Sequence, residues 1–430
     1  MIEKEIRVRR PELLAPAGSF EKLVTAIHYG ADAVYCAGKR YGLRARAANF
    51  SEEGLEEAVD YAHAHRVKLY VAVNILAHDR DLAGLDEYLA FLGRIGVDGL
   101  IVADPGILVR AARLIPGIPI HLSTQANVTN VESALFWCRQ GARRLNLARE
   151  LSLTEISAIT AALAASGLVP PRETELFVHG ALCISYSGRC LLSSYLTGRD
   201  ANQGDCAHPC RYRYRLEEEK RPGEFFPVEE DEYGTYIFNS RDLCLLHRLG
   251  DLTAAGADSF KIEGRMKSTF YVGAVVRLYR AALDFLRDHL GEPLPPLFRE
   301  ELARVGTRGY TENFIDSPPG PREMLYDTPR TVQEWVPAGV VRRLLPAATV
   351  GGPGMEMEVR NTLRQGEILE FMGHGLQNIA FPLAAMRNPE GESLIRAHPG
   401  NIIRIEGLPA SAWWRENGLV RKKPHPAGDR

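Results

Sequence analysis

The residues of this chain with the clearest capacity for chemistry are its cysteines. Five of the seven thiols fall between residues 183 and 244, in the segments ELFVHGALCISYSGRC, NQGDCAHPCR and NSRDLC. Six residues separate Cys183 from Cys190, and three separate Cys206 from Cys210. The N-terminus shows no secretory signal, so this cluster is more typical of metal binding or redox chemistry than of disulfides.

The spacing of the thiols leaves three interpretations open: an iron–sulfur cluster, a structural zinc site, or packed thiols without metal. Zinc sites use tight cysteine pairs, and only Cys206 and Cys210, with His208 between them, are that close. The looser spacing of the other thiols favours a cluster. Cys36 and Cys138 lie on an apolar strand and an amphipathic helix, and we expect them to pack as core thiols.

Short apolar runs alternate with amphipathic helical stretches from residue 12 to about residue 290. Ser19 precedes one helical stripe as an N-cap, and Ser152 with Glu155 forms a capping box before another. Eight such units predict an α/β fold, a (β/α)8 TIM-like barrel. A doubly wound sheet is less favoured, because the first turn, PAGS, lacks a GxGxxG fingerprint. The eight predicted strands are residues 12–17, 31–37, 68–74, 98–104, 118–127, 143–149, 175–180 and 258–264.

Polar residues alternate with apolar ones on three of these strands. The sets that share a face are His121, Ser123, Gln125 and Asn127; Glu175, Phe177 and His179; and Ser259, Lys261 and Glu263. The apolar face must contact the helices, so the polar sets are expected to point into the barrel. Barrel lumens are normally apolar, so this polarity favours a site at the C-terminal rim. The alternative is a plug of paired residues such as Lys261 and Glu263.

Several residues near strand ends are candidates for this rim site. The catalytic candidates are His179, Lys261 and Glu263, and the substrate-binding candidates are Arg46, Gln125, Asn127, Arg149 and Arg265. Arginine forks suit carboxylates and phosphates, although each arginine could instead pair with a neighbouring acid. Arg211, Arg213 and Arg215 alternate with two tyrosines after the last cysteine pair. That patch is a candidate for binding RNA, or a strand with one solvated face.

The predicted organisation has four parts. The barrel occupies residues 1–290 and contains an insertion at 181–257 after its seventh strand, which carries the cysteines. Residues 291–328 form a linker or helical extension, 329–418 a small C-terminal β-barrel, and 419–430 a disordered tail. The chain shows no apolar segment long enough for a membrane span, which predicts a cytoplasmic protein. With a net charge of −2, contact with RNA must come from local patches.

The motifs of the barrel resemble those of the U32 family, historically called collagenase-like peptidases. ELLAPAGSFEKLVTAIHYGADAVY, GLRARAANF, STQAN, ARELSL, the three cysteine segments and DSFKIEGRMKS follow in order from about residue 12 to 290. The C-terminal RNTLRQGEILEFM resembles the small barrel of the branch that hydroxylates tRNA. That branch implies oxygen-independent hydroxylation of the wobble uridine to 5-hydroxyuridine, with tRNA and prephenate as partners and prephenate as the oxygen donor.

The resemblance also implies a [4Fe–4S] cluster. Its ligands would be Cys183, Cys190, Cys206 and Cys244, with Cys210 as an extra thiol beside the site. A U32 peptidase and a zinc-stabilised RNA-binding protein without catalysis are the alternatives. The peptidase has less support, because the chain shows neither HExxH nor GxSxG, and thiolates bound to iron cannot act as nucleophiles. Whether a second U32 subunit takes part stays open.

Overall fold

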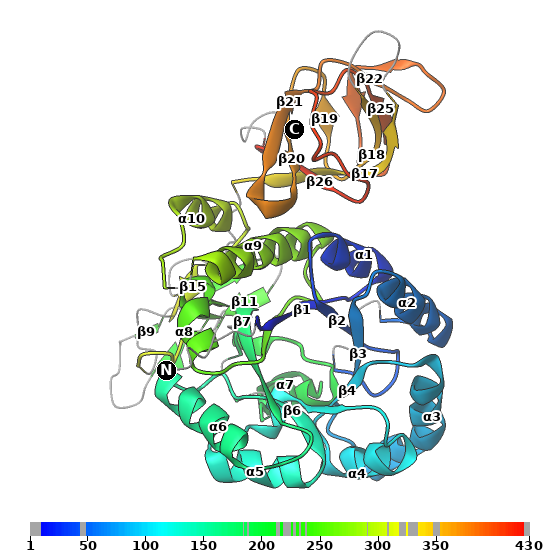
Figure 1. Ribbon diagram of the computed structural model, residues 1–430. Helices are drawn as coiled ribbons and strands as arrows, with labels where there is room; N and C mark the ends of the chain where they lie inside the picture. The colour runs from blue at the N-terminus through cyan, green and yellow to red at the C-terminus, as the bar shows by residue number, and fades with distance from the viewer. Residues whose placement is uncertain are drawn as a thin grey trace, which may run out of the picture.

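The computed structural model describes most of the chain. The described residues are 10–43, 49–183, 185–186, 189–211, 216–217, 225–226, 229–231, 234–236, 239–289, 291–307, 309–317, 324–325, 334–346 and 353–424. They form an α/β barrel followed by a β domain (Figure 1). Among these residues, no helix has the length and apolar character to cross a membrane.

The barrel is closed by eight parallel strands, because β14 pairs with both β1 and β7. Figure 1 shows helices surrounding this ring of strands. The predicted (β/α)8 barrel is therefore confirmed. The strands are β1 (Glu12–Pro16), β2 (Ala33–Cys36), β3 (Lys68–Val73), β4 (Gly99–Val102), β5 (Ile120–Leu122), β6 (Ala142–Asn146), β7 (Glu173–Gly180) and β14 (Ser259–Ile262). The helices are α1 (Phe20–His28), α2 (Glu52–Ala64), α3 (Leu85–Ile95), α4 (Pro105–Leu114), α5 (Val131–Arg139), α6 (Leu153–Ala165), α8 (Leu249–Ala254) and α9 (Thr269–Asp288).

Local capping signals set the helix starts as expected. The Ser19 side chain accepts a hydrogen bond from the backbone of Lys22 at the start of α1, and Ser152 and Glu155 form the predicted capping box of α6. An apolar core fills the space between strands and helices, and Cys36 and Cys138 are fully buried in it. The prediction that these two are packed core thiols is confirmed.

The fifth strand is shorter than predicted. Its ladder ends at Leu122, and Thr124–Ala126 form a turn of 3-10 helix. Asn127 then adopts the left-handed conformation, with φ of 52°, and its side chain donates to the Gln125 carbonyl. Asparagine tolerates this region because its amide can bond to nearby backbone. The expected common strand face from His121 to Asn127 is therefore wrong beyond Leu122.

The insertion lies between β7 and β14 and carries its own short elements. They are α7 (Leu192–Thr197), β8 (Leu216–Glu217), β9 (Phe225–Phe226), β10 (Glu229–Asp231), β11 (Gly234–Tyr236), β12 (Asn239–Ser240) and β13 (Asp242–Cys244). β13 pairs antiparallel with the end of β7, where Leu243 faces Gly180. β15 (Tyr310–Thr311) pairs with β13, so part of the predicted linker extends the barrel sheet. That linker also contains α10 (Pro296–Ala303) and β16 (Met324–Leu325).

The C-terminal domain is an eight-stranded antiparallel sheet with the order β21-β20-β26-β17-β18-β25-β22-β23. It forms a half-barrel around an apolar core that includes Phe371, Phe381 and Trp414. Its strands are β17 (Val336–Leu345), β18 (Gly354–Val359), β20 (Ile368–Met372), β21 (Asn378–Pro382), β22 (Met386–Arg387), β23 (Ser393–Leu394), β25 (Ile402–Ile405) and β26 (Leu419–Lys422), with β19 (Leu363–Arg364) paired to β24 (Arg396–Ala397).

The assignment of residues 419–430 to a disordered tail is wrong for its first four residues. Leu419–Lys422 form β26, which lies inside the sheet between β20 and β17. The charges that made this stretch look like a tail are neutralised in the fold. Arg421 bonds to Glu301 and Glu370, and Lys422 bonds to Glu367 at 2.9 Å. Residues 425–430 lie outside the described residues.

Candidate active site

A cavity of about 210 Å³ lies at the C-terminal ends of the barrel strands. Asn74 reaches it from the end of β3, Gln125 from the turn after β5, Asn146 from the last position of β6 and Lys261 from β14. Thiols of the insertion, among them Cys206, complete the wall. This is the face on which barrel enzymes place their active sites.

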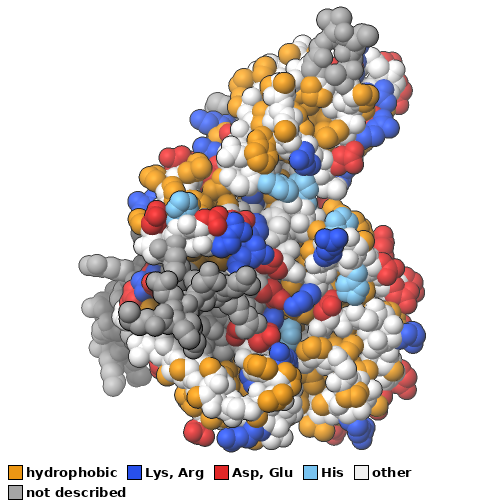
Figure 2. Space-filling view, viewed as in Figure 1, with side chains coloured by type: hydrophobic (Ala, Val, Ile, Leu, Met, Phe, Trp, Pro, Cys, Tyr) orange, Lys and Arg blue, Asp and Glu red, His pale blue; other side chains and the backbone are white. Residues whose placement is uncertain are grey.

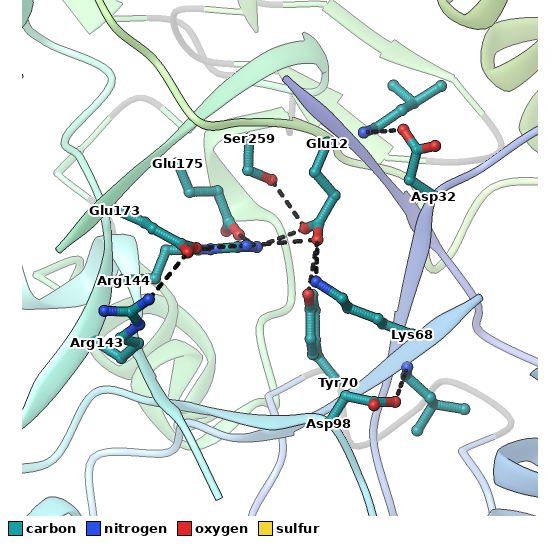
Figure 3. Close-up of polar contacts among 12 residues, drawn as sticks. Glu12, Asp32, Lys68, Tyr70, Asp98, Arg143, Arg144, Glu173, Glu175 and Ser259 are labelled. Atoms are coloured by element: carbon teal, nitrogen blue, oxygen red, sulfur yellow. Dashed lines mark hydrogen bonds and ion pairs between the residues drawn. The ribbon is translucent and has the colours of Figure 1, made fainter. Parts of the chain in front are cut away.

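Ion pairs fill the lumen below this cavity (Figure 3). Arg144 on β6 bonds to Glu12 on β1 at 2.5 Å, and the Tyr70 hydroxyl donates to the same carboxylate at 2.8 Å. Lys261 lies 2.8 Å from Glu175 on β7. The lumen therefore holds a polar plug, and the cavity lies above it. The alternative interpretation, a plug that pairs Lys261 with Glu263, is wrong about the acid, because Lys261 forms its ion pair with Glu175.

Burial and charge act against each other in this network. Burial alone would raise the pKa of Glu12, but the charge and hydrogen bonds of Arg144 hold that pKa below its ordinary value. Burial lowers the pKa of Lys261, although the Glu175 carboxylate opposes the shift. The Lys261 ammonium lies 4.6 Å from the Tyr35 ring and 5.3 Å from the Phe177 ring, at the floor of the cavity.

Two of the three predicted rim arginines line the cavity. Arg149 donates to the Ala181 carbonyl at 3.0 Å, and its guanidinium lies 5.1 Å from the Phe177 ring. Arg265 is buried and donates to the Leu43 carbonyl. The structure thus brings Arg149, Arg265, Lys261, Glu263 and Gln125 to one cavity. Asn127 is not among the lining residues and instead bonds to the backbone of the Gln125 turn.

Four thiols share the cavity wall: Cys183, Cys190, Cys206 and Cys210. The Cys206 sulfur accepts a hydrogen bond from the His208 backbone N–H at 3.3 Å. Soft sulfur donors on one wall fit an iron–sulfur cluster or another thiophilic metal. Two observations favour such a metal centre: the donors are sulfur atoms, and they lie on one wall of the cavity. In the part of the chain that the structure describes, no three His, Cys, Asp or Glu side chains are grouped closely enough to hold a metal ion.

Cys244 and His179 lie apart from the cavity lining. They face each other across the β13–β7 ladder, and both side chains are buried. The Cys244 sulfur lies 3.8 Å from the Tyr279 hydroxyl, which is also 3.2 Å from His179 Nδ1. Burial lowers the pKa of His179 to about 4, so its ring is neutral at physiological pH. His179 also packs near the rings of Tyr271 and Tyr310.

The predicted basic patches fall largely beyond what the structure describes. Arg46, Arg213 and Arg215 lie outside the described residues, and Arg211 is described only in its backbone. On the face seen in Figure 2, acidic and basic side chains are mixed over the barrel and the C-terminal domain. That face gives no single broad basic field, in agreement with the net charge of −2.

Sequence reasoning missed two residues of the site, Asn74 and Asn146. Both are amides at the C-terminal end of a strand, and both line the cavity beside Gln125. Asn74 donates to the Gln125 side chain at 2.8 Å, and Asn146 donates to Glu175 at 2.8 Å. The sequence did contain a signal for both. Asn74 lies four residues after the inward-facing Tyr70, and Asn146 lies two residues after the inward-facing Arg144, so each shares the inward side of its strand.

Comparison with known proteins gives matches over nearly the whole chain. The model of peptidase family U32 matches residues 18–325, and that of the U32 C-terminal domain matches 338–421. tRNA hydroxylation protein P1 of Bacillus subtilis (strain 168) is 36% identical over 407 residues, which cover 94% of this chain and 93% of the relative. tRNA hydroxylation protein P of Escherichia coli (strain K12) is 37% identical over 427 residues, covering 90% and 91%.

Among solved structures, the U32 peptidase Mk0906 is 18% identical and covers 61% of this chain and 95% of its own, with a TM-score of 0.39. The two family models together span both structural units, and the two curated relatives each cover nine tenths of this chain or more. The barrel with its thiol-bearing insertion and the C-terminal half-barrel are therefore the two parts of one family architecture. The chain belongs to peptidase family U32.

Proposed function

We propose that this chain is an oxygen-independent tRNA hydroxylase that forms 5-hydroxyuridine at the wobble position, with prephenate as oxygen donor. The relatives named tRNA hydroxylation proteins support the reaction class. The observation that carries the proposal is the cavity itself, which joins a wall of thiols to cationic side chains at the mouth of the barrel.

The cations of the cavity suit a dicarboxylate such as prephenate. Arg149, Arg265 and Lys261 all line it, and guanidinium groups bind carboxylates through two parallel hydrogen bonds. Arg149 and Arg265 are each held by a backbone carbonyl, so their forks are already oriented. We assign prephenate binding to these two arginines, with Arg46 as the third. Lys261 and Glu263 are then the groups positioned to hold or move a proton at the reacting atoms.

A [4Fe–4S] cluster bound to the thiols would supply one-electron chemistry at this wall. The proposed ligands are Cys183, Cys190 and Cys206, with Cys244 as the fourth. The ladder to β7 pairs Cys244 with His179, which lies four residues before Cys183 in the sequence. We assign His179 a positioning role there, because its ring contacts Tyr279, which also contacts Cys244.

The proposed function is tested with anaerobically purified protein, prephenate whose hydroxyl oxygen is labelled with ¹⁸O, and tRNA from a strain that lacks the gene. We expect iron and acid-labile sulfide in the protein, and 5-hydroxyuridine that carries the label. 5-Hydroxyuridine formed with oxygen from water would refute prephenate as donor. Zinc without sulfide would instead favour a zinc-stabilised RNA-binding protein, and no 5-hydroxyuridine at all would contradict the reaction.

A further inference from the structure

Two buried amides of the cavity each have one polar atom without a hydrogen-bond partner among the described residues. They are Nε2 of Gln125 and Oδ1 of Asn146, in side chains that are 5% and 2% exposed. Both residues line the cavity. A buried polar atom without a partner is costly, and native proteins keep few of them. These two atoms therefore indicate contacts that a bound molecule completes.

The orientation of the Gln125 amide is fixed by a chain of partners. The Leu43 backbone N–H donates to Oδ1 of Asn74 at 3.1 Å, which turns the Asn74 amino group toward Gln125. That group donates to Oε1 of Gln125 at 2.8 Å, and the Ser123 hydroxyl donates to the same oxygen at 3.1 Å. Amide orientation is decided by such partners. Gln125 must therefore present its NH₂ group, a donor, to the cavity.

The orientation of Asn146 is fixed in the opposite sense. Its Nδ2 donates at 2.8 Å to Oε1 of Glu175, the oxygen that also accepts from Lys261. An ionised carboxylate only accepts hydrogen bonds, so Asn146 cannot turn its oxygen toward Glu175. The Oδ1 atom is left for the cavity as an acceptor. The turn after β5 and the end of the neighbouring strand β6 thus offer one fixed donor and one fixed acceptor.

We propose that Gln125 and Asn146 read the edge of the target base, with Gln125 donating to O4 of uracil and Asn146 accepting from N3–H. This inference rests on the proposed function. Cytosine carries an amino donor and a ring-nitrogen acceptor at the same positions, so both contacts would be mismatched. A carboxylate offers acceptors only, and would leave the Asn146 oxygen facing another oxygen. The pair therefore selects uridine over cytidine.

The surroundings of the pair suit a base turned out of the RNA. The rings of Tyr35 and Phe177 line the same cavity, and the Tyr35 hydroxyl is fixed by its bond to the Ile262 carbonyl at 3.0 Å. Enzymes that modify a base commonly hold it between such rings and read its Watson–Crick edge. A site built to hydrogen-bond a group rejects the analogue that lacks it, because its own buried atoms stay unpaired.

The Asn146 contact is tested by binding of two anticodon stem–loop RNAs, one with uridine and one with 3-methyluridine at the target position. We expect the wild-type protein to bind the methylated RNA at least about tenfold more weakly, and Asn146→Ala to bind both RNAs alike. Asn130→Ser, a helix N-cap outside the cavity, is the matched control and keeps the discrimination. Discrimination by a folded Asn146→Ala protein equal to that of the wild type would overturn the assignment.

The Gln125 contact is tested by Gln125→Glu, which replaces the free donor by an acceptor while Asn74 and Ser123 still hold the other oxygen. We expect the ratio of uridine to cytidine stem–loop affinity to fall by about tenfold or more. An unchanged ratio in a protein with wild-type thermal melting would overturn the inference. If the wild-type protein forms no 5-hydroxyuridine, the result counts against the proposed function. If the wild-type protein forms 5-hydroxyuridine but Gln125→Glu leaves the uridine-to-cytidine affinity ratio unchanged, the result counts only against the proposed contact with the base.

Discussion

The clustered thiols occupy two different environments. Cys183, Cys190, Cys206 and Cys210 line the cavity, whereas Cys244 is buried on β13. Burial raises the pKa of Cys244 to about 11. The strand nevertheless makes it a rigid anchor, because the ladder to β7 fixes its backbone. Cys210 instead lies in the short 3-10 turn Pro209–Arg211.

We expect Cys244→Ser, purified without oxygen, to lose most of its iron and acid-labile sulfide, because one of four proposed ligands is gone. Cys210→Ser is the matched control and should keep both at the wild-type level. Metal and sulfide analysis with visible absorption measures the difference. The reverse pattern would assign the fourth position to Cys210, and full loading of both variants would refute the four-thiol set.

At the scale of elements, the turn between β1 and α1 supports the loop after β14. A Cβ atom on Gly18 would lie 2.0 Å from the Arg265 carbonyl oxygen, and the Lys22 ammonium donates to that oxygen at 3.1 Å. Only a residue without a side chain allows this approach. The PAGS turn thus holds the backbone that carries Arg265 into the cavity.

Replacing Gly18 by Ala should therefore push this loop away and lower the free energy of unfolding by about 1–3 kcal/mol. Gly117→Ala is the control, since a Cβ there meets no atom within 4 Å, and it should change stability by less than about 0.5 kcal/mol. Urea unfolding monitored by circular dichroism measures both. Equal stability of the two variants would show that the loop after β14 moves away from the new side chain without a loss of unfolding free energy.

Much of the element order could be predicted because its signals are local. Caps such as Ser19 and the Ser152–Glu155 box define helix starts within a few residues, and apolar runs define the strands. The end of β5 could not be predicted, because the 3-10 turn that follows it has alternating polar residues and resembles a continued strand in the sequence. β26 was missed for a related reason: its charges find partners only in the folded protein.

The sequence predicted many of the residues of the candidate site, but it did not predict which of them contact one another. The alternative interpretation, a polar plug, paired Lys261 with Glu263, two residues along the same predicted strand. The acid that Lys261 contacts, Glu175, lies 86 residues away and reaches it through the register of β14 against β7. The positions of Asn74 and Asn146 likewise depend on which strands are neighbours, and this is a property of barrel closure that no local pattern contains.

At the scale of the whole molecule, a buried ion network joins the barrel to the C-terminal domain. Arg421 of β26 is 1% exposed and bonds to Glu301 of α10 at 2.8 Å and to Glu370 of β20 at 2.5 Å. Arg277 of α9 bonds to the same Glu301. The Tyr29 hydroxyl of the barrel donates to the Met372 carbonyl at 2.9 Å. These contacts fix the C-terminal domain against α9 and α10.

We expect Arg421→Met to lower the free energy of unfolding by about 1–3 kcal/mol, because it removes the buried guanidinium that bonds to both Glu301 and Glu370. Arg304 still contacts both carboxylates, so their charges stay compensated. Arg404→Met removes a partly exposed arginine from Glu356 in the same domain, and as the control it should cost less than about 1 kcal/mol. Denaturant unfolding of both variants measures the difference. Similar losses of unfolding free energy in the two variants would show that the ion network does not stabilise the contact between the barrel and the C-terminal domain.

The same interface should weaken in mild acid. Burial, and then the charges of His374 and Arg415, lower the pKa of His28 to about 3. The fold therefore favours neutral His28, and the stability that it contributes is present above pH 6.5 and is lost as the pH falls from about 6.5 toward 3. His28→Gln should flatten this loss in thermal melts between pH 7 and pH 4.5. An identical pH dependence in the variant and the wild type would contradict the assignment.

The most direct test of the whole account is nucleoside mass spectrometry of tRNA from a strain that lacks this gene. We predict that the wobble uridine loses its 5-hydroxy group and the modifications built on it, that the wild-type chain restores them, and that Cys206→Ser does not. Unchanged wobble-uridine modification in the deletion strain, or full restoration by Cys206→Ser, would contradict a thiol-dependent tRNA hydroxylase.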